Sequence, residues 1–281
     1  MSPQEPLSLT PIPGGDTAAT AEATFTIDFD ALAANGFFAP SKSPKRLSLE
    51  LRAIKRRLLR RLNFRKRGAR VPTGREGVAE ARRRNLVLTT STRPAEGKTF
   101  TSLNLALSLA IEDGIGVILI DADLPRPRVL KQFGLSPRQG FSDLVSDPEA
   151  PPVKDLLIHA DQFPLSILSQ GLYEGRSADL YEREETGEVL RRLSARYPDR
   201  LIILDAPPVL AMPDANILAR HVDEVLFVVE AGTTSEPAVV SALDEVLDAN
   251  EKISLILNKC LAAESAVHYG SYEEYYDRED R

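Results

Sequence analysis

The feature that most constrains the fold of this chain is a series of short apolar runs that alternate with segments of helical periodicity. The apolar runs are residues 86–90, 117–120, 165–168, 201–204, 225–229 and 253–257, and the helical segments are residues 98–112, 176–196 and 236–249. Nearly continuous apolar strands separated by helices are typical of a parallel sheet that is covered on both faces. We therefore expect an α/β fold with a mostly parallel central sheet flanked by helices.

The loop after the first strand has the composition of a phosphate-binding loop. Residues 91–99 read Ser-Thr-Arg-Pro-Ala-Glu-Gly-Lys-Thr and lead into a helical segment. A loop that feeds a helix N-terminus presents backbone N–H groups and a positive dipole end to phosphate. Lys98 would reach the outer phosphates, and the hydroxyl of Thr99 would bind Mg²⁺. Thr92 stands where the usual motif begins with Gly, so we expect a P-loop NTPase fold with a deviant Walker A loop.

The expected contacts of this loop with a nucleotide are Pro94, Ala95, Glu96, Gly97, Lys98, Thr99 and Phe100. The alternative is a chance Gly-Lys-Thr sequence in a turn. The order of strand, loop and helix argues against chance, because that order is the structural context the motif requires.

Acidic residues follow two of the apolar runs at the places where the strands should end. Asp121 and Asp123 follow residues 117–120, and Asp205 follows residues 201–204. Mg²⁺ prefers a few carboxylates together with water and phosphate oxygens. A single Asp at such a turn is often only a helix cap, but three carboxylates beside the loop favour a magnesium site. Asn258 follows the last strand and is either a contact to a nucleotide base or a turn residue.

The charge of the chain is unevenly distributed. The formal net charge is −6, yet residues 42–84 hold 17 Lys and Arg against 3 acidic residues, a net of +14 that leaves −20 elsewhere. Within this region, residues 47–63 have the spacing of an amphipathic helix, and residues 65–84 resemble a linker. The segregation suggests a surface for nucleic acid, anionic lipid or an acidic protein face, or else a solvated basic helix.

Composition excludes several classes of protein. With 43% hydrophobic and 27% charged residues, the chain can bury a core and is not wholly disordered. No apolar run approaches the ~18–20 residues of a membrane-spanning helix, and no secretory signal is visible. The single cysteine, Cys260, excludes a disulfide framework and fits a reducing cytoplasm, while three scattered histidines form no metal cluster. The first strand lacks the Gly-x-Gly-x-x-Gly of a dinucleotide-binding oxidoreductase.

Three motifs together resemble those of the bacterial tyrosine kinases. These are the loop of residues 90–99 followed by Asn-Leu-Ala at 104–106, the Ile-Leu-Ile-Asp-Ala-Asp of residues 118–123, and the Leu-Asp-Ala-Pro-Pro-Val-Leu of residues 204–210. Within that family, residues 51–56, 96–104 and 196–200 are most similar to the exosortase-associated tyrosine autokinases. The resemblance covers about residues 47–281.

The resemblance implies a P-loop fold that differs from eukaryotic kinases, with ATP and Mg²⁺ as cofactors. It assigns the phosphates to Lys98, the catalytic base to Asp121, and the magnesium ion to Thr99, Asp123 and Asp205; the expected catalytic residues are Lys98, Asp121, Asp123 and Asp205. It also implies a homo-oligomeric ring and a membrane polysaccharide co-polymerase that activates the kinase. A cognate tyrosine phosphatase would complete the set of partners, and no nucleic acid is expected.

The chain departs from the family pattern at several positions. Ala95 stands where Gly is usual, and Pro125 stands where the second motif usually has Arg. The next residue, Arg126, is the candidate replacement and an expected nucleotide contact. In the helix of the ring interface, the usual Glu-x-x-Arg-x-x-Arg frame is filled by Leu49, Arg52 and Lys55.

The C-terminal segment supplies its own candidate substrate. Four of the seven tyrosines lie in the last 13 residues, surrounded by acidic side chains: Tyr269, Tyr272, Tyr275 and Tyr276. A terminal acidic segment of this kind should be mobile, which suits a tyrosine that enters a neighbour's site. The alternative is an aromatic tail docked on the domain.

The resulting hypothesis divides the chain into four parts: a flexible leader (1–46), a basic helix and linker (47–84), an ATP-binding kinase domain (85–262) and a flexible tyrosine-rich tail (263–281). The expected function is an autokinase that regulates exopolysaccharide polymerisation and export, cytoplasmic and recruited to the inner face of the plasma membrane. The first alternative is a non-kinase ATPase switch of the partition type, although such proteins carry an early loop Lys where this chain has Ser91, Thr92 and Arg93. The second alternative is a nucleotide-binding scaffold.

Overall fold

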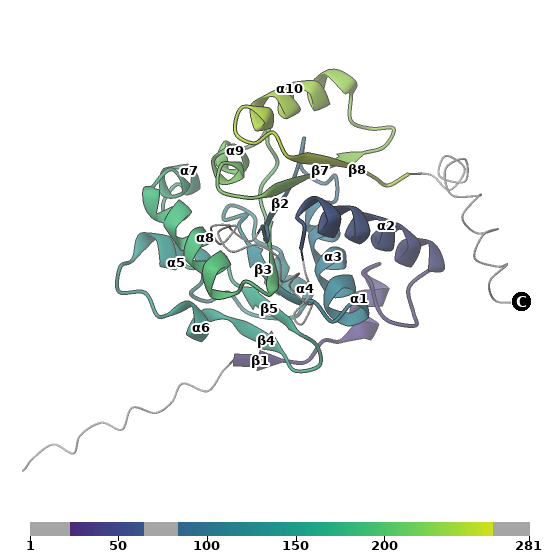
Figure 1. Ribbon diagram of the computed structural model, residues 1–281, viewed down its shortest axis with the longest axis horizontal. Coiled ribbons are helices and arrows are strands. Elements are labelled where there is room, and N and C mark those ends of the chain that lie inside the picture. The colour runs from purple at the N-terminus through teal and green to yellow at the C-terminus, as the bar shows by residue number, and fades with distance from the viewer. Residues whose placement is uncertain (1–22, 65–83, 261–281) are drawn as a thin grey trace, which may run out of the picture.

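The structure, a computed structural model, describes residues 23–64 and 84–260 and shows one eight-stranded sheet with helices on both faces (Figure 1). The mostly parallel sheet confirms the expected α/β architecture. Within the two described ranges, no helix is both long and apolar enough to cross a lipid bilayer. The tyrosine cluster and nearly all of the expected linker lie outside the described residues.

The elements agree with most of the expected strands and helices. The strands are β1 (Ala23–Phe25), β2 (Leu86–Ser91), β3 (Gly116–Asp121), β4 (Ile158–Ala160), β5 (Leu165–Leu168), β6 (Arg200–Asp205), β7 (Glu224–Glu230) and β8 (Ile253–Asn258). The helices are α1 (Phe29–Ala34), α2 (Lys45–Arg61), α3 (Lys98–Glu112), α4 (Val129–Gln132), α5 (Phe141–Ser146), α6 (Val153–Leu156), α7 (Ser177–Tyr181), α8 (Glu184–Arg196), α9 (Asp214–Ala219) and α10 (Glu236–Leu247).

The order of the strands brings the polar strand ends to one edge of the sheet. The order is β1-β4-β5-β3-β6-β2-β7-β8, and every neighbouring pair is parallel except β4 and β5. Because β3 and β6 are adjacent, Asp121 and Asp205 are paired residues in the register. On the other side of β6, Thr89 of β2 is also a partner of Asp205. The two acidic motifs and the phosphate loop therefore follow three neighbouring strands, β3, β6 and β2.

Alternate side chains of the strands enter two separate cores. Leu88 and Ile120 face the core under α8 and α9, whereas Val87 and Leu119 face the core under α3 and α2. Helix α3 is covered by the sheet on one side and by α2 on the other, so its dense leucines are fully buried.

Part of the expected flexible leader belongs to the folded domain, which corrects that expectation for the residues from Ala23 onward. Strand β1 pairs with β4 at the edge of the sheet, and Phe25 packs edge-on against Phe133 at 5.3 Å between ring centroids. The backbone N–H of Phe38 donates to Asn104 Oδ1 of α3 at 2.5 Å. The physical reason is the apolar content of this stretch, because burying Phe rings offsets the entropy of ordering the chain.

The helix expected over residues 176–196 is instead two helices, α7 and α8. Leu180 and Tyr181 are buried in α7, and Val189, Leu190 and Leu193 are buried in α8. In one continuous helix these two groups would point in nearly opposite directions. The break after α7 allows both groups to face the same core.

In the described part of the chain, the sequence pattern predicts none of seven short elements: β1, α1, α4, α5, α6, β4 and α9. Each has only three to six residues. Hydrophobic periodicity needs a longer window to distinguish a helix from a strand or a loop. Tertiary contacts therefore decide these elements.

Helix α2 divides the basic segment into a buried and an exposed face. Leu51 and Leu58 are buried against α3, and Leu62, one helical turn after Leu58, is also buried. Lys55 is also buried, and its Nζ lies 2.5 Å from Glu112 and 2.8 Å from Asp113 at the end of α3. Lys55 thus bonds within its own chain, although it fills one position of the frame expected at the ring interface.

Replacing Lys55→Met should lower the free energy of unfolding by about 1–3 kcal/mol, because two carboxylates lose a charged partner at a buried site. Arg56→Met is the matched control, since Arg56 lies on the exposed face, and its effect should stay within about 0.5 kcal/mol. Urea unfolding of both variants measures the difference. Equal effects would contradict the structural role assigned to Lys55.

Candidate active site

The loop between β2 and α3 has a backbone shaped for an anion. Ala95 has φ 72° and Gly97 has φ 101°, so two residues of the loop adopt left-handed conformations just before α3 begins at Lys98. Turns of this kind direct backbone N–H groups into a concavity, and the helix N-terminus adds its dipole. The loop therefore has the geometry that its sequence predicts.

Two residues at the end of β8 clamp this loop. Asn258 Nδ2 donates to the carbonyl of Glu96 at 2.8 Å, and Lys259 Nζ donates to the carbonyl of Ala95 at 2.8 Å. A Cβ on Gly97 would lie 2.0 Å from Asn258 Nδ2, so this close approach requires glycine. The side chain of Asn258 thus holds the loop, and its contact with a nucleotide base stays a prediction.

The other loop residues of the expected nucleotide site differ in what their side chains do. Glu96 is buried, accepts from the N–H of Arg93 at 2.8 Å and also accepts from the hydroxyl of Thr234. Phe100 packs against Phe37 with 5.5 Å between ring centroids. The side chains of Glu96 and Phe100 are therefore used within the protein, whereas Pro94 is exposed. Their contacts with a nucleotide remain predictions.

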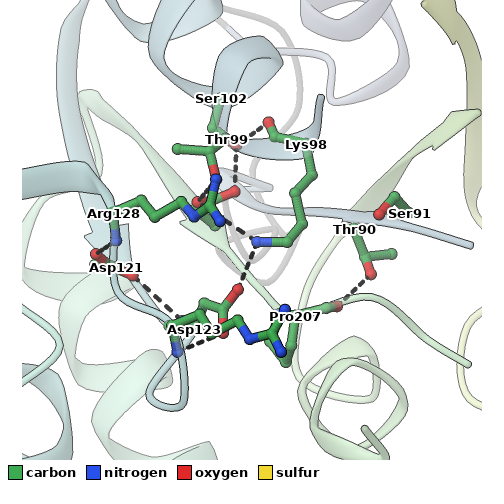
Figure 2. A network of polar contacts seen from close by, with 12 residues as sticks. Thr90, Ser91, Lys98, Thr99, Ser102, Asp121, Asp123, Arg128 and Pro207 are labelled. Atoms are coloured by element: carbon green, nitrogen blue, oxygen red, sulfur yellow. Dashed lines mark hydrogen bonds and ion pairs between the residues drawn. The ribbon is translucent and has the colours of Figure 1, made fainter. Parts of the chain in front are cut away.

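Lys98 lies at the centre of a buried polar cluster (Figure 2). Its Nζ is 2.6 Å from Asp123 Oδ2 and 4.0 Å from Asp205 Oδ2. Thr99 is the next residue of α3, and its hydroxyl donates to Asp205 Oδ2 at 2.6 Å. The hydroxyl of Ser102 donates to Asp205 Oδ1 at 3.1 Å. The structure therefore brings together four residues that the sequence singled out from three separate motifs.

The charges of this cluster hold Lys98 in its ionised form. Burial by itself would lower the pKa of Lys98, but the negative charges of Asp205 and Asp123 outweigh it and raise that pKa. Burial also raises the pKa of Asp205, against the opposing effect of Lys98. The site carries more buried carboxylates than cations, which favours a further cation.

Asp121 is fully buried at the end of β3 beside these groups. Its Oδ2 accepts from the backbone N–H groups of Arg128 and Val129, both at 2.9 Å, and its Oδ1 accepts a longer bond of 3.3 Å from Asp123. Burial, followed by the charge of Asp205, raises the pKa of Asp121 to about 7. A carboxyl group with this pKa can exchange a proton near neutral pH, as a general base must.

Two buried residues near the turn after β3 were not found by sequence reasoning. Tyr181 is fully buried, and its hydroxyl donates to the carbonyl of Ala122 at 3.0 Å, which fixes the turn between the two aspartates. Asp214 is a further buried carboxylate whose pKa is raised by burial, and the charge of Asp123 adds to the effect. Tyr181 lies far from the motifs in sequence, whereas Asp214 follows the motif of residues 204–210 by four residues, and no local pattern marks either of them.

Two arginines, Arg126 and Arg128, lie in the turn that follows β3. Arg126 is exposed, and its backbone N–H donates to Asp123 Oδ1 at 3.2 Å. Figure 2 shows the side chain of Arg128 extending from this turn toward Thr99. The predicted nucleotide contact of Arg126 stays a prediction. Sequence reasoning did not single out Arg128, whose only signal in the sequence is its place two residues after Arg126.

The oxygen atoms around Thr99 fit a hard cation. The Thr99 hydroxyl and the Asp205 carboxylate are adjacent, and both are the hard oxygen ligands that Mg²⁺ prefers. Among the described residues, no three His, Cys, Asp or Glu side chains converge closely enough to hold a metal by themselves. A magnesium ion here would need phosphate oxygens and water to complete its ligands.

Replacing Ala95→Gly should raise the free energy of unfolding by about 0.5–1 kcal/mol, because glycine adopts the left-handed conformation of Ala95 without steric cost. Ala53→Gly, on the exposed face of α2, is the control and should lower that free energy by about 1 kcal/mol. Chemical denaturation of both variants gives the comparison. A loss of stability in both would show that Ala95 is not strained.

The free energy of unfolding of the nucleotide-free chain should fall as the pH rises from 5 to 8. The folded chain keeps the Asp121 proton up to about pH 7, whereas an unfolded Asp loses it near pH 4, so the folded state binds more protons in between. Asp121→Asn should reduce this fall, by on the order of a few kcal/mol. Melting temperatures at several pH values test this, with the exposed Asp248→Asn as control; identical pH profiles for all three proteins would contradict it.

Comparisons of sequence identify named kinases as relatives. No family model matches the chain. The chain is 29% identical over 177 residues to the tyrosine-protein kinase ptk of Acinetobacter johnsonii, which is 63% of this chain and 24% of that protein. It is 27% identical over 211 residues to the tyrosine-protein kinase YwqD of Bacillus subtilis, which is 74% of this chain and 87% of that protein. The chain thus spans about a quarter of the first relative and most of the second.

A comparison of structures agrees with these relatives. The crystal structure of the VpsO kinase domain matches with a TM-score of 0.62 and 30% sequence identity, covering 77% of this chain and 95% of that domain. This domain is covered almost completely by the match. The chain belongs to the bacterial tyrosine kinase family.

Proposed function

We propose that the chain is a Mg²⁺- and ATP-dependent tyrosine kinase that phosphorylates its own cluster Tyr269, Tyr272, Tyr275 and Tyr276. The observation that carries the proposal is the buried cluster of Lys98, Thr99, Asp123 and Asp205 at the N-terminus of α3. Phosphoryl transfer depends mainly on positioning and on neutralising charge, which such a cluster supplies. Family membership supports the choice of tyrosine as acceptor.

Lys98 would serve as the contact to the outer phosphates. Its ammonium group is held in position by Asp123 and kept ionised by the surrounding carboxylates. The N–H groups of the loop and of the first turn of α3 would hold the same phosphates. Thr99, Asp123 and Asp205 would hold Mg²⁺, which supplies neutralisation of phosphate charge when it is bound.

Asp121 would accept the proton of the attacking tyrosine hydroxyl. Two backbone N–H groups anchor its Oδ2, while its Oδ1 accepts only the long bond from Asp123 and so is the better placed to take a proton. The tyrosine oxygen forms a bond to the γ-phosphorus of ATP, the bond to the bridging oxygen of ADP breaks, and the proton moves to Asp121. The near-neutral pKa of Asp121 supports this role.

We further propose that this activity regulates exopolysaccharide polymerisation and export at the inner face of the plasma membrane. The resemblance to exosortase-associated autokinases supports a membrane co-polymerase as activator, a homo-oligomer as the working assembly and a cognate phosphatase as the opposing enzyme. The exposed basic face of α2 is one surface available for such contacts.

The test is intact mass spectrometry of the full chain after incubation with Mg²⁺ and ATP. The parent should gain a ladder of phosphates that map to the four tyrosines. Lys98→Met should gain none, because the contact to the outer phosphates is lost. Lys252→Met, a change of an exposed lysine, should behave like the parent.

The outcomes separate the proposal from its alternatives. Hydrolysis of ATP without phosphate on the tyrosines, even with the cytoplasmic segment of the co-polymerase added, would favour an ATPase switch. Binding of ATP with neither hydrolysis nor transfer would favour a scaffold. Phosphate on Lys98→Met would show that a contaminating kinase made the modification.

A further inference from the structure

The outward face of α2 carries a row of cations that form no ion pair in the part of the chain that the structure describes. Lys45, Arg52, Arg56 and Arg60 are exposed and, by helical spacing, lie within one arc of the helix on the side away from α3. None of the four makes an ion pair within residues 23–64 or 84–260. A cation row that has no ion-pair partner in these two ranges is a surface suited to an acidic ligand.

The described chain ends beside this face. Arg46 Nη2, in the first turn of α2, donates to the carbonyl of Cys260 at 3.3 Å. Figure 1 shows β8 leading toward the beginning of α2, so the residues that follow Cys260 start at one end of the cation row.

The sequence after Cys260 has the opposite charge and a sufficient length. Residues 261–281 contain six acidic residues and two arginines, a net charge of −4. Tyr269 is the ninth residue after Cys260, which gives a reach of about 30 Å when the chain is extended. Helix α2 has 17 residues and is about 25 Å long. The acidic tyrosine cluster can therefore reach any turn of the cation row.

We propose that residues 261–281 dock along the exposed face of α2 in the same chain, as an electrostatic clasp. The acidic side chains Glu273, Glu274 and Asp277 pair with the arginines of α2, which holds the tyrosines away from solution. The clasp does not depend on kinase activity, because it rests on charge and on the position of Cys260. A phosphate on any tyrosine would add about −1.5 to −2 charges and tighten the clasp.

The clasp would be coupled to the phosphate loop through three consecutive residues. Asn258 and Lys259 hold the carbonyl groups of Glu96 and Ala95, and Cys260 contacts Arg46. The segment after Cys260 therefore continues directly from the two residues that clamp the loop. Docking on α2 fixes the direction in which the chain leaves this clamp.

The test is disulfide cross-linking in the full chain without nucleotide. In a Cys260→Ser background, Ser271→Cys in the acidic segment is combined with Ala53→Cys on the exposed face of α2. The matched control combines Ser271→Cys with Ala195→Cys, an exposed alanine of α8 on the opposite side of the sheet. The α2 pair should cross-link within one chain at least about tenfold faster, and 1 M salt should abolish the difference, since the Debye length falls to about 3 Å.

Charge reversal tests whether electrostatics causes the contact without risk to the fold. Glu273→Lys with Glu274→Lys should lower the cross-linking rate at Ala53→Cys to that of the control. Adding Arg52→Glu and Arg56→Glu should restore it. Equal rates at α2 and α8, or no response to charge reversal, would overturn the clasp.

Two other occupants of the face give distinct results. Cross-links that join two chains would show that the segment docks on a second copy, and would overturn docking in the same chain. Absence of the cross-link, together with binding to vesicles of 30% phosphatidylserine that is lost in Arg52→Glu/Arg56→Glu, would assign the face to anionic lipid and also overturn the clasp.

Discussion

The ion pair between Lys98 and Asp123 is the interaction on which the site depends. It joins the first turn of α3 to the turn after β3, and Asp205 at 4.0 Å adds the end of β6. Burying a lysine or aspartate without a charged partner would cost several kcal/mol of stability, so each charge lowers the free-energy cost of burying the others. The cluster thus joins three elements by ion pairs, and in the proposed function phosphate and Mg²⁺ would take over part of this charge pairing.

The loop itself relies on β8 for its shape. Its left-handed Ala95 is the residue whose carbonyl Lys259 binds, and Gly97 is packed against Asn258. Backbone strain persists only where surrounding contacts over-determine the conformation. The end of β8 therefore holds the conformation of the loop that follows β2.

The sequence predicted those parts of the site that lie in continuous motifs. The helix α3 begins at Lys98, and the strands β3 and β6 end at Asp121 and Asp205. The predicted start of the helix and the predicted ends of the strands therefore placed these three residues together. The sequence did not predict Asp214, because α9 is too short to show a readable periodicity. It did not predict the hydroxyl contact of Tyr181 either, because that contact depends on the break between α7 and α8. In the same way, a parallel sheet was predictable from apolar runs, whereas the antiparallel pair of β4 and β5 was not.

The basic segment shows why composition alone could not assign its role. Lys55 and Arg56 are neighbours of like charge, yet one is buried between two carboxylates and the other is exposed without an ion pair in the described chain. Leucine spacing decides the difference, since it turns one side of α2 toward α3 and the acidic end of that helix. Within α2, the charge excess that remains for recognition consequently lies on the outward face, and the cation row there begins where the chain leaves the clamp of the phosphate loop.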